Sequence, residues 1–301
     1  MEDRRLLKDY RSYLKIERSM SPNTVSAYSR DVAAFLEWAD SLRREVRGTS
    51  LLAAITQEDI VGYMQSMPEK TVSKRSQARA LSSLRSFFNW SVMEGYLKGN
   101  PCDGIDSPKL GRYLPAVLSV EEVGRIMDAV PLDNETGLRD RAILEMLYGC
   151  GLRVSEASGM RISDLFFNDG FIRVVGKGDK ERLVPIGDMA RDAVCGYLDV
   201  RSRPSAPQYS DTLFLNRRGT GLSRVSIFNL VKHYTMLAGI DKEISPHIFR
   251  HSFATHLIEN GADLRIVQEM LGHESIMTTE IYTHIDSSTW QASVLDHHPR
   301  R

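Results

Sequence analysis

Two side chains in the second half of the chain are spaced so that they could act together on a phosphate group. They lie in Ser245-Pro246-His247-Ile248-Phe249-Arg250-His251. Serine followed by proline is typical of a helix start, so His247 and Arg250 are expected in the first turn, on one face. Free N–H groups at a helix N-terminus, together with a histidine and an arginine, suit an oxyanion such as phosphate. Taken alone the motif is weak, because a surface arginine and a half-buried histidine give the same pattern.

A tyrosine lies beyond a second histidine. Tyr282 follows His273 by nine residues, across a break marked by Gly272. A tyrosine in an apolar setting usually belongs to a core. Here several side chains that could contact phosphate lie within forty residues of it, which makes an ordinary core role less expected.

Another arginine follows two glycines, in Gly149-Cys150-Gly151-Leu152-Arg153-Val154-Ser155-Glu156. The glycines predict a turn, and a helix is expected to open near Arg153. By itself this pattern is equally compatible with a plain turn and a surface salt bridge.

Helical spacing of apolar residues predicts the elements that position these groups in the first hundred residues. Leu6, Tyr10 and Leu14 mark a first helix, and Ser21 with Pro22 begins a second. Further helices are expected over 57–67 and 71–95. Four helices without a strand-like segment predict a small helical domain at residues 1–100.

Glycine and proline crowd residues 99–115, so residues 101–115 are interpreted as a linker to a second domain at 116–301. A helix should begin at Ser119, where Ser119 and Glu122 form a capping box. Most later segments are helical, but the β-rich runs 171–175 and 182–186 flank Gly176-Lys177-Gly178-Asp179-Lys180 and predict a hairpin with a basic tip. The expected fold class is mainly α, in two domains, with a small antiparallel β-sheet in the second.

Four blocks occur in a fixed order: GLRVSE, GKGDKER, HIFRHSFATH, and LGH followed by IYTH. This order resembles the tyrosine recombinase (phage integrase-like) family and, within it, the Xer recombinases. The run Ser21-Pro22-Asn23-Thr24-Val25 is similar to the start of their SAM-like core-binding domain, so the resemblance extends over almost the whole chain. The tail His297-His298-Pro299-Arg300 is nearer to the XerD branch than to the XerC branch.

The resemblance implies a site and its roles. Tyr282 would be the nucleophile, and Glu156 would support the site. Residues 287–301 would form a tail that docks on a neighbouring protomer. The implied catalytic set is Arg153, Lys177, His247, Arg250, His273 and Tyr282.

The chemistry of phosphodiester transesterification explains why such groups are needed. Two guanidiniums, Arg153 and Arg250, can stabilise the charge that develops on the non-bridging oxygens. A phenol has an ordinary pKa of about 10, so our hypothesis is that His247 accepts or relays the proton of Tyr282. In the same hypothesis His273 hydrogen-bonds a non-bridging oxygen, and Lys177 protonates the leaving 5′-oxygen. A covalent 3′-phosphotyrosine would conserve the bond energy, so that rejoining needs no ATP.

No cofactor and no metal ion are expected. The histidines His247, His251 and His256 are spaced by four and five residues and lack the H-E-x-x-H pattern. Cys102, Cys150 and Cys195 are far apart and odd in number, which argues against disulfides and zinc and favours buried free thiols.

Contacts to DNA outside the site are expected from a basic cluster in the first domain. A helix with this charge could lie against phosphates or enter a major groove, although a solvated charged face is the alternative. The cluster is Lys70, Lys74, Arg75, Arg79 and Arg85.

Composition sets only broad limits. Apolar residues make up 42% and charged residues 26%, as in globular proteins, and no stretch approaches the length of a membrane span. We therefore expect a cytoplasmic protein without membrane contact. The net charge is zero, with 39 basic and 39 acidic residues, so binding to DNA must depend on local basic faces.

The resemblance implies strand exchange at paired DNA sites, as in the resolution of chromosome or plasmid dimers. The implied partners are double-stranded DNA, a second Xer-type recombinase in a heterotetramer or a homotetramer, and an FtsK-type DNA translocase. Three alternatives remain: an integrase or invertase of a mobile element, a DNA-binding module without catalysis, and a relaxing enzyme of the type IB topoisomerase kind.

Overall fold

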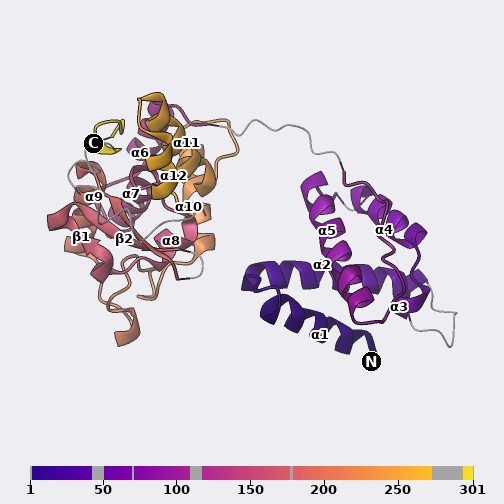
Figure 1. The fold of residues 1–301 in the computed structure, drawn as a ribbon. Coiled ribbons are helices and arrows are strands. Elements are labelled where there is room, and N and C mark those ends of the chain that lie inside the picture. Colours follow the sequence, from indigo (N-terminus) through magenta and orange to yellow (C-terminus); the bar gives the residue numbers. More distant parts are fainter. Residues whose placement is uncertain are drawn as a thin grey trace. The chain divides into compact units, whose positions relative to one another are not determined.

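The structure is a computed structural model that describes residues 2–42, 51–69, 71–108, 117–176, 179–272 and 294–300. Its internal contacts divide the chain into two compact units, Met1–Tyr113 and Leu114–Arg301 (Figure 1). Both units are built mainly from helices, as predicted.

The first unit is helical throughout its described residues, and the four predicted helices are confirmed. They pack around aromatic side chains that are fully buried, among them Tyr10, Phe35, Phe87 and Phe88. A short helix, Leu51–Ala54, was not expected. The elements are α1 (Glu2–Ile16), α2 (Pro22–Leu42), α3 (Leu51–Ala54), α4 (Gln57–Glu69) and α5 (Lys74–Met93).

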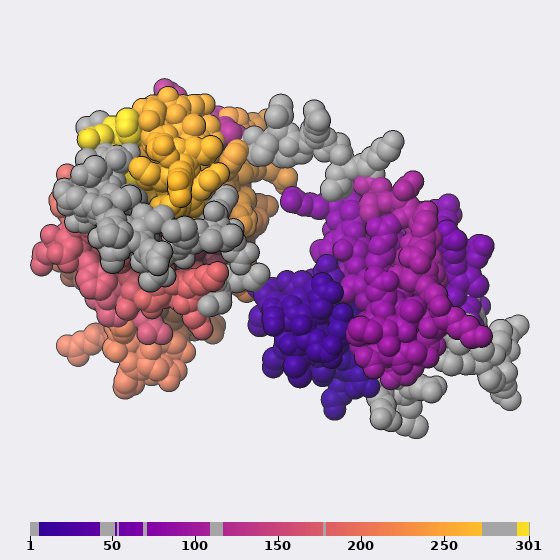
Figure 2. Space-filling view, in the orientation of Figure 1, coloured from indigo at the N-terminus to yellow at the C-terminus, as the bar shows by residue number. Residues whose placement is uncertain are grey.

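Helix α5 begins three residues later than predicted. Ser73 caps it by accepting a hydrogen bond from the backbone N–H of Ser76 at 3.3 Å, which ends the preceding turn. Beyond α5, Cys102 is fully buried and Ile105 packs against the same core. Residues of α1 and α2, in indigo, lie at the surface of this unit (Figure 2).

The second unit contains the remaining helices and the sheet. Its α-helices are α6 (Val120–Asp128), α7 (Glu135–Gly149), α8 (Val154–Gly159), α9 (Asp188–Val200), α10 (Arg224–Leu237), α11 (Pro246–Glu259) and α12 (Leu264–Met270). Its described residues also form the short 3₁₀ helices η1 (Ile162–Asp164), η2 (Phe167–Asp169) and η3 (Pro207–Tyr209).

Helix α7 is the centre of the second unit. Every residue from Ala142 to Tyr148 is buried, and α7 contacts α6, α8, α9, α10 and α11. A helix that is buried on all sides must be surrounded by other elements, so the rest of the unit packs around it.

The predicted hairpin is confirmed. Strands β2 (Phe171–Val175) and β3 (Glu181–Pro185) pair antiparallel, with Arg173 opposite Leu183, and β3 begins one residue earlier than expected. The short strand β1 (Leu165–Phe166) pairs with β2 and was not predicted. Tip residues 177 and 178 lie outside the described residues.

One of the three thiols is placed differently from the prediction. Cys102 and Cys150 are buried, but Cys195 is exposed. The buried residues of α9 are Ala190, Val194 and Tyr197, and the position after Val194 falls on the outer face of that helix. In the part of the chain that the structure describes, no helix has the length and apolar character to cross a membrane.

The start of the second unit is fixed to α11. The capping box of Ser119 and Glu122 is present as predicted, with the Ser119 backbone N–H donating to Glu122 Oε2 at 2.8 Å. One residue earlier, the Leu118 N–H donates at 2.9 Å to Oγ of Ser252, which is fully buried in α11. A buried N–H has no water to replace such a partner.

We expect Ser252→Ala to lower the free energy of unfolding of the second unit by about 1–3 kcal/mol, because the Leu118 N–H would remain buried without an acceptor. Calorimetric melting of the full chain measures this change. Ser158→Ala is the matched control, since Ser158 is also a helical serine, but its Oγ makes only an exposed hydrogen bond, as a donor to a carbonyl of its own helix. It should alter stability by less than about 0.5 kcal/mol. Equal effects of the two substitutions would contradict the prediction.

Candidate active site

Arg153 is the N-cap residue of α8, close to the predicted helix start, and it is tied to Glu156 in the first turn of that helix. The Arg153 backbone N–H donates to Oε2 of Glu156 at 2.8 Å, and its Nη1 donates to Oε1 at 2.8 Å. The Glu156 side chain is 2% exposed, whereas that of Arg153 is 34% exposed. One buried carboxylate therefore orients a guanidinium that solvent and a ligand can still reach.

A second arginine holds the same carboxylate from the hairpin. Arg182 of β3 donates from Nη1 and Nη2 to the two oxygens of Glu156, both at 2.9 Å. This bidentate pair is the strong form of a guanidinium–carboxylate interaction.

A third guanidinium approaches from α11. Arg250 is 8% exposed, and its Nη1 lies 3.7 Å from Oε2 of Glu156. Nη1 also donates to the Gly151 carbonyl at 2.7 Å, and Nη2 donates to the Leu271 carbonyl. Burial, together with the positive charge of Arg153, lowers the pKa of Arg250 to about 10. At neutral pH it is still a cation.

One of the two carbonyls that accept hydrogen bonds from Arg250 belongs to Gly151, a position that requires a glycine. Gly151 has a φ of +58°, and a Cβ there would lie 2.6 Å from Cδ1 of Phe253. Because α11 carries both Phe253 and Arg250, this close approach places the Gly151 carbonyl within reach of the guanidinium.

The cluster carries an excess of positive charge that an anion can neutralise. Burial opposes ionisation of Glu156, but hydrogen bonds and the charge of Arg182, with the bonds from Arg153, hold its pKa below the usual value. Three guanidiniums then surround one carboxylate, and Arg153 remains accessible. Such a site suits a phosphodiester.

The structure thus brings together Arg153, Glu156 and Arg250 from the predicted set. His247 is exposed in the first turn of α11, three residues before Arg250, and that helix runs from the predicted start to Glu259, with Asn260 as its C-cap residue. Three other predicted residues lie outside the described residues: Lys177, His273 and Tyr282.

The remaining histidines of α11 do not gather at one place. His251 is exposed, whereas His256 is buried and its Nδ1 lies 2.7 Å from the hydroxyl of Tyr148. Within the described ranges, no group of three or more His, Cys, Asp or Glu side chains could hold a metal ion.

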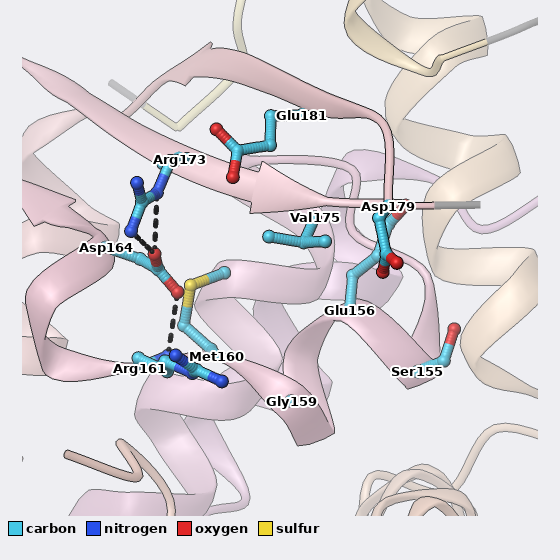
Figure 3. A pocket seen from close by; sticks show the side chains of 10 residues that line it. All are labelled: Ser155, Glu156, Gly159, Met160, Arg161, Asp164, Arg173, Val175, Asp179 and Glu181. Carbon is cyan, nitrogen blue, oxygen red and sulfur yellow. Dashed lines mark hydrogen bonds and ion pairs between the residues drawn. The ribbon is translucent and has the colours of Figure 1, made fainter. Parts of the chain in front are cut away.

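A pocket of about 440 Å³ lies beside Glu156 (Figure 3). In it Arg173 forms an ion pair with Asp164 at 2.8 Å. Asp179 and Glu181 add further carboxylates to its wall. Four carboxylates against two arginines would repel a phosphate, so this pocket is not the phosphate site.

Two of the basic residues predicted to contact DNA have partners within the first unit. Arg79 pairs with Asp31 at 3.0 Å, and Arg85 donates to the Ile105 carbonyl. Lys74 and Arg75 are exposed at the start of α5, and Lys70 lies outside the described residues. Arg79 and Arg85 therefore also have structural roles.

Arg182 was missed by the sequence analysis, although a signal was present. The burial of β3 alternates, with Arg182 and Val184 inside and Leu183 outside. An arginine at an inward position of a strand is a buried charge that needs a partner.

The end of the chain packs on its own unit. Val294 is buried in the core, and the ring of His298 contacts those of Tyr148 and Phe253. Arg300 Nη2 donates to Oε1 of the buried Glu145 at 2.7 Å. Residues 294–300 thus contact the chain that carries them. Residues 287–293 lie outside the described residues, and the docking of the tail 287–301 on a neighbouring protomer stays a prediction.

Comparison with known families identifies the class of protein. Residues 116–289 match the Phage integrase family, and residues 7–95 match the Phage integrase, N-terminal SAM-like domain. The chain belongs to the phage integrase family and is a tyrosine recombinase, an enzyme that exchanges DNA strands.

Individual relatives carry the name of one branch. Tyrosine recombinase XerD of Chlorobaculum tepidum is 44% identical over 301 residues, covering 99% of this chain and 97% of the relative. The XerD of Corynebacterium glutamicum is 41% identical and both chains are covered completely. Among solved structures, XerA recombinase is 31% identical, covers 99% of each chain and has a TM-score of 0.50. A lambda integrase dimer bound to a COC' core site has the same fold, with a TM-score of 0.70 at 19% identity over 90% of this chain and 95% of that one.

We expect Glu156→Gln to lower the free energy of unfolding by about 3 kcal/mol, because three neighbouring guanidiniums would lose their counter-charge. The pKa of Glu156 is lowered in the folded state, so its contribution is present above its unfolded pKa and is lost as pH falls through the folded value. The stability difference between the two proteins should therefore shrink below about pH 4.

Urea unfolding between pH 3 and 8 measures this difference. Glu181→Gln is the matched control, because Glu181 is an exposed glutamate that directly precedes Arg182 in β3. A constant difference across this pH range would contradict the assigned charge state.

Proposed function

We propose that this recombinase cleaves and rejoins DNA through a covalent 3′-phosphotyrosine at Tyr282, and that it resolves chromosome or plasmid dimers. The observation that carries the proposal is the cluster of Arg153 and Arg250 around Glu156, in a chain 44% identical to a XerD recombinase. Such a cluster can bind a phosphate before the reaction and stabilise it more strongly as charge develops.

Each side chain has a role that its chemistry supports. The guanidiniums of Arg153 and Arg250 would hold the two non-bridging oxygens. His247 would take up or relay the phenolic proton, and His273 would donate a hydrogen bond to a non-bridging oxygen. Lys177, in the tip of the β2–β3 hairpin, would protonate the 5′-oxygen as it leaves. Attack by a 5′-hydroxyl of another strand would reverse these steps, with no ATP, metal ion or cofactor required.

The partners follow from the relatives. A solved XerH recombinase is bound to its difH substrate, and a lambda integrase tetramer is bound to a Holliday junction. By analogy we propose a duplex recombination site as the substrate and a tetramer as the active assembly. The second recombinase would be a paralogue or another copy of this chain, and an FtsK-type translocase would activate cleavage. Because chromosomal DNA is the substrate, the protein would act in the cytoplasm.

The first unit would contribute DNA contacts. Lys74 and Arg75 are exposed at the N-terminal end of α5, where backbone N–H groups add favourable charge for phosphate. We propose that these residues, with Lys70, contact the duplex, and that Arg79 and Arg85 contribute positive potential while keeping their internal partners. Residues 101–115 would link the two domains so that both can contact one duplex.

We expect the protein to form a covalent adduct with a nicked DNA substrate that carries a Xer-type site, in the presence of EDTA. Loss of the short fragment beyond the nick prevents rejoining, so the adduct accumulates and is seen on a denaturing gel. Tyr282→Phe removes the nucleophile and should abolish the adduct while binding to DNA continues. A persistent adduct in that variant would assign the nucleophile to another residue. Binding of DNA without an adduct, even with a partner recombinase and translocase, would favour a binding module.

We expect Lys177→Ala to slow cleavage of ordinary DNA by roughly 100-fold or more, the usual scale for loss of a general acid. A sulfur in place of the bridging 5′-oxygen is a better leaving group that needs no proton. On that substrate the variant should cleave at nearly the wild-type rate. Lys180→Ala, at the same hairpin tip, is the control. An equal defect of Lys177→Ala on both substrates would contradict the role as general acid.

A further inference from the structure

Arg182 contacts α8 and α12 and lies beside the backbone that leads into Lys177 and His273. Its side chain is 7% exposed, and its two Nη atoms hold both oxygens of Glu156 at 2.9 Å. Its Nε donates to the Met270 carbonyl at the end of α12, at 2.6 Å. One guanidinium thus connects the hairpin, α8 and α12.

Two glycines border this guanidinium. A Cβ at Gly272 would lie 3.4 Å from Nη1 of Arg182, and a Cβ at Gly176 would lie 3.6 Å from the same atom. In the sequence, Gly176 directly precedes Lys177 and Gly272 directly precedes His273. The backbone directly before Lys177 and directly before His273 therefore lies next to Arg182.

The same contacts fix Arg153. Its Nη1 shares Oε1 of Glu156 with Nη1 of Arg182, and its Nη2 donates to the Gly272 carbonyl at 3.3 Å. The accessible guanidinium is thus oriented by a carboxylate and by a turn, and Arg182 contacts both.

A buried cation beside two other cations is a costly arrangement. Arg182 and Arg250 both lie within 4 Å of Glu156, and like charges at such distances repel. If Arg182 served only to pair Glu156 with a counter-charge, Arg153 and Arg250 would already supply one. The donors of Arg182 join the hairpin to α8 and to α12, whereas the described hydrogen bonds of Arg153 and Arg250 do not reach the hairpin.

We propose that Arg182 is a positioning residue for strand cleavage: it orients Arg153 through Glu156 and fixes the α12 turn and the hairpin backbone. This inference rests on the proposed function. It assigns to Arg182 no contact with DNA, since all of its described contacts are internal.

Cleavage and binding should respond differently to substitution of Arg182. We expect Arg182→Met to lower the single-turnover rate of adduct formation by roughly 100-fold, the scale of a small misplacement of catalytic groups. DNA affinity should change by less than about threefold. Arg173→Met is the matched control, because Arg173 lies on the paired strand and forms an ion pair with Asp164 rather than with Glu156. It should cleave at a rate within about threefold of the wild type.

A double-substitution cycle tests whether Arg182 acts through Glu156. If it does, Arg182→Met combined with Glu156→Gln should be about as slow as the slower single variant. Multiplied defects would overturn the proposal, and so would a wild-type rate in Arg182→Met or a loss of affinity equal to the loss of rate.

If Arg182→Met does not fold, Arg182→Lys is used. It keeps the charge without the bidentate geometry and should cleave at least about tenfold more slowly than the wild type at unchanged affinity. A wild-type rate would overturn the proposal.

A second readout separates this inference from the proposed function. Sulfate ions should raise the melting temperature of the wild type by binding at Arg153. Arg182→Lys should weaken this binding and raise the half-saturating sulfate concentration at least about threefold. Arg173→Met should leave it unchanged. If the wild type forms no adduct but these sulfate responses are seen, the assignment of substrate or partner fails while the role of Arg182 holds. Equal sulfate responses in the wild type and Arg182→Lys would overturn the role of Arg182.

Discussion

One buried carboxylate keeps three guanidiniums together in the second unit. At an effective dielectric of about 20, two unit charges about 4 Å apart interact by roughly 4 kcal/mol, so arginines packed this closely would separate without a counter-charge. Glu156 supplies that charge through ion pairs at 2.8, 2.9 and 3.7 Å. It leaves a positive excess, which a phosphodiester can neutralise. The same residue that holds the three guanidiniums together therefore also leaves the positive charge that we propose binds a phosphate of DNA.

The need for this counter-charge explains why segments far apart in the sequence come together in a fixed geometry. Arg250 is held by the carbonyls of Gly151 and Leu271, Arg153 by that of Gly272, and Arg182 by that of Met270. Backbone carbonyls cannot change rotamer, so the guanidiniums are fixed by the path of the chain as well as by the Glu156 side chain. Catalysis by preorganised charge requires such rigidity, because reorganisation during the reaction would reduce the benefit.

Local sequence signals predicted the elements well, because their causes are local. The capping box at Ser119, the proline start of α11 and the β2–β3 hairpin each depend on residues a few positions apart. The short elements α3 and β1 lack such signals. Arg182 depends on partners 26 and 88 residues away, and the pairing of Arg79 with Asp31 spans 48 residues. The resemblance to a family implied Arg153, Glu156 and Arg250 as site residues, and the structure brings these three together, but spacing alone left Arg153 and Arg250 compatible with ordinary surface residues. Cys195 shows the converse case, where a general tendency of cysteine was overridden by its place on the outer face of α9.

The packing of residues 294–300 has a practical consequence for handling the protein. Arg300 shares the buried Glu145 with Arg141, and His298 is 4% exposed between two aromatic rings. A proteolytic cut between His298 and Arg300 would take away half of the counter-charge of Glu145, although no helix or strand would be shortened. Preparations in which some molecules carry such a cut would then contain molecules of unequal stability, and mass spectrometry would detect the mixture before any assay of recombination.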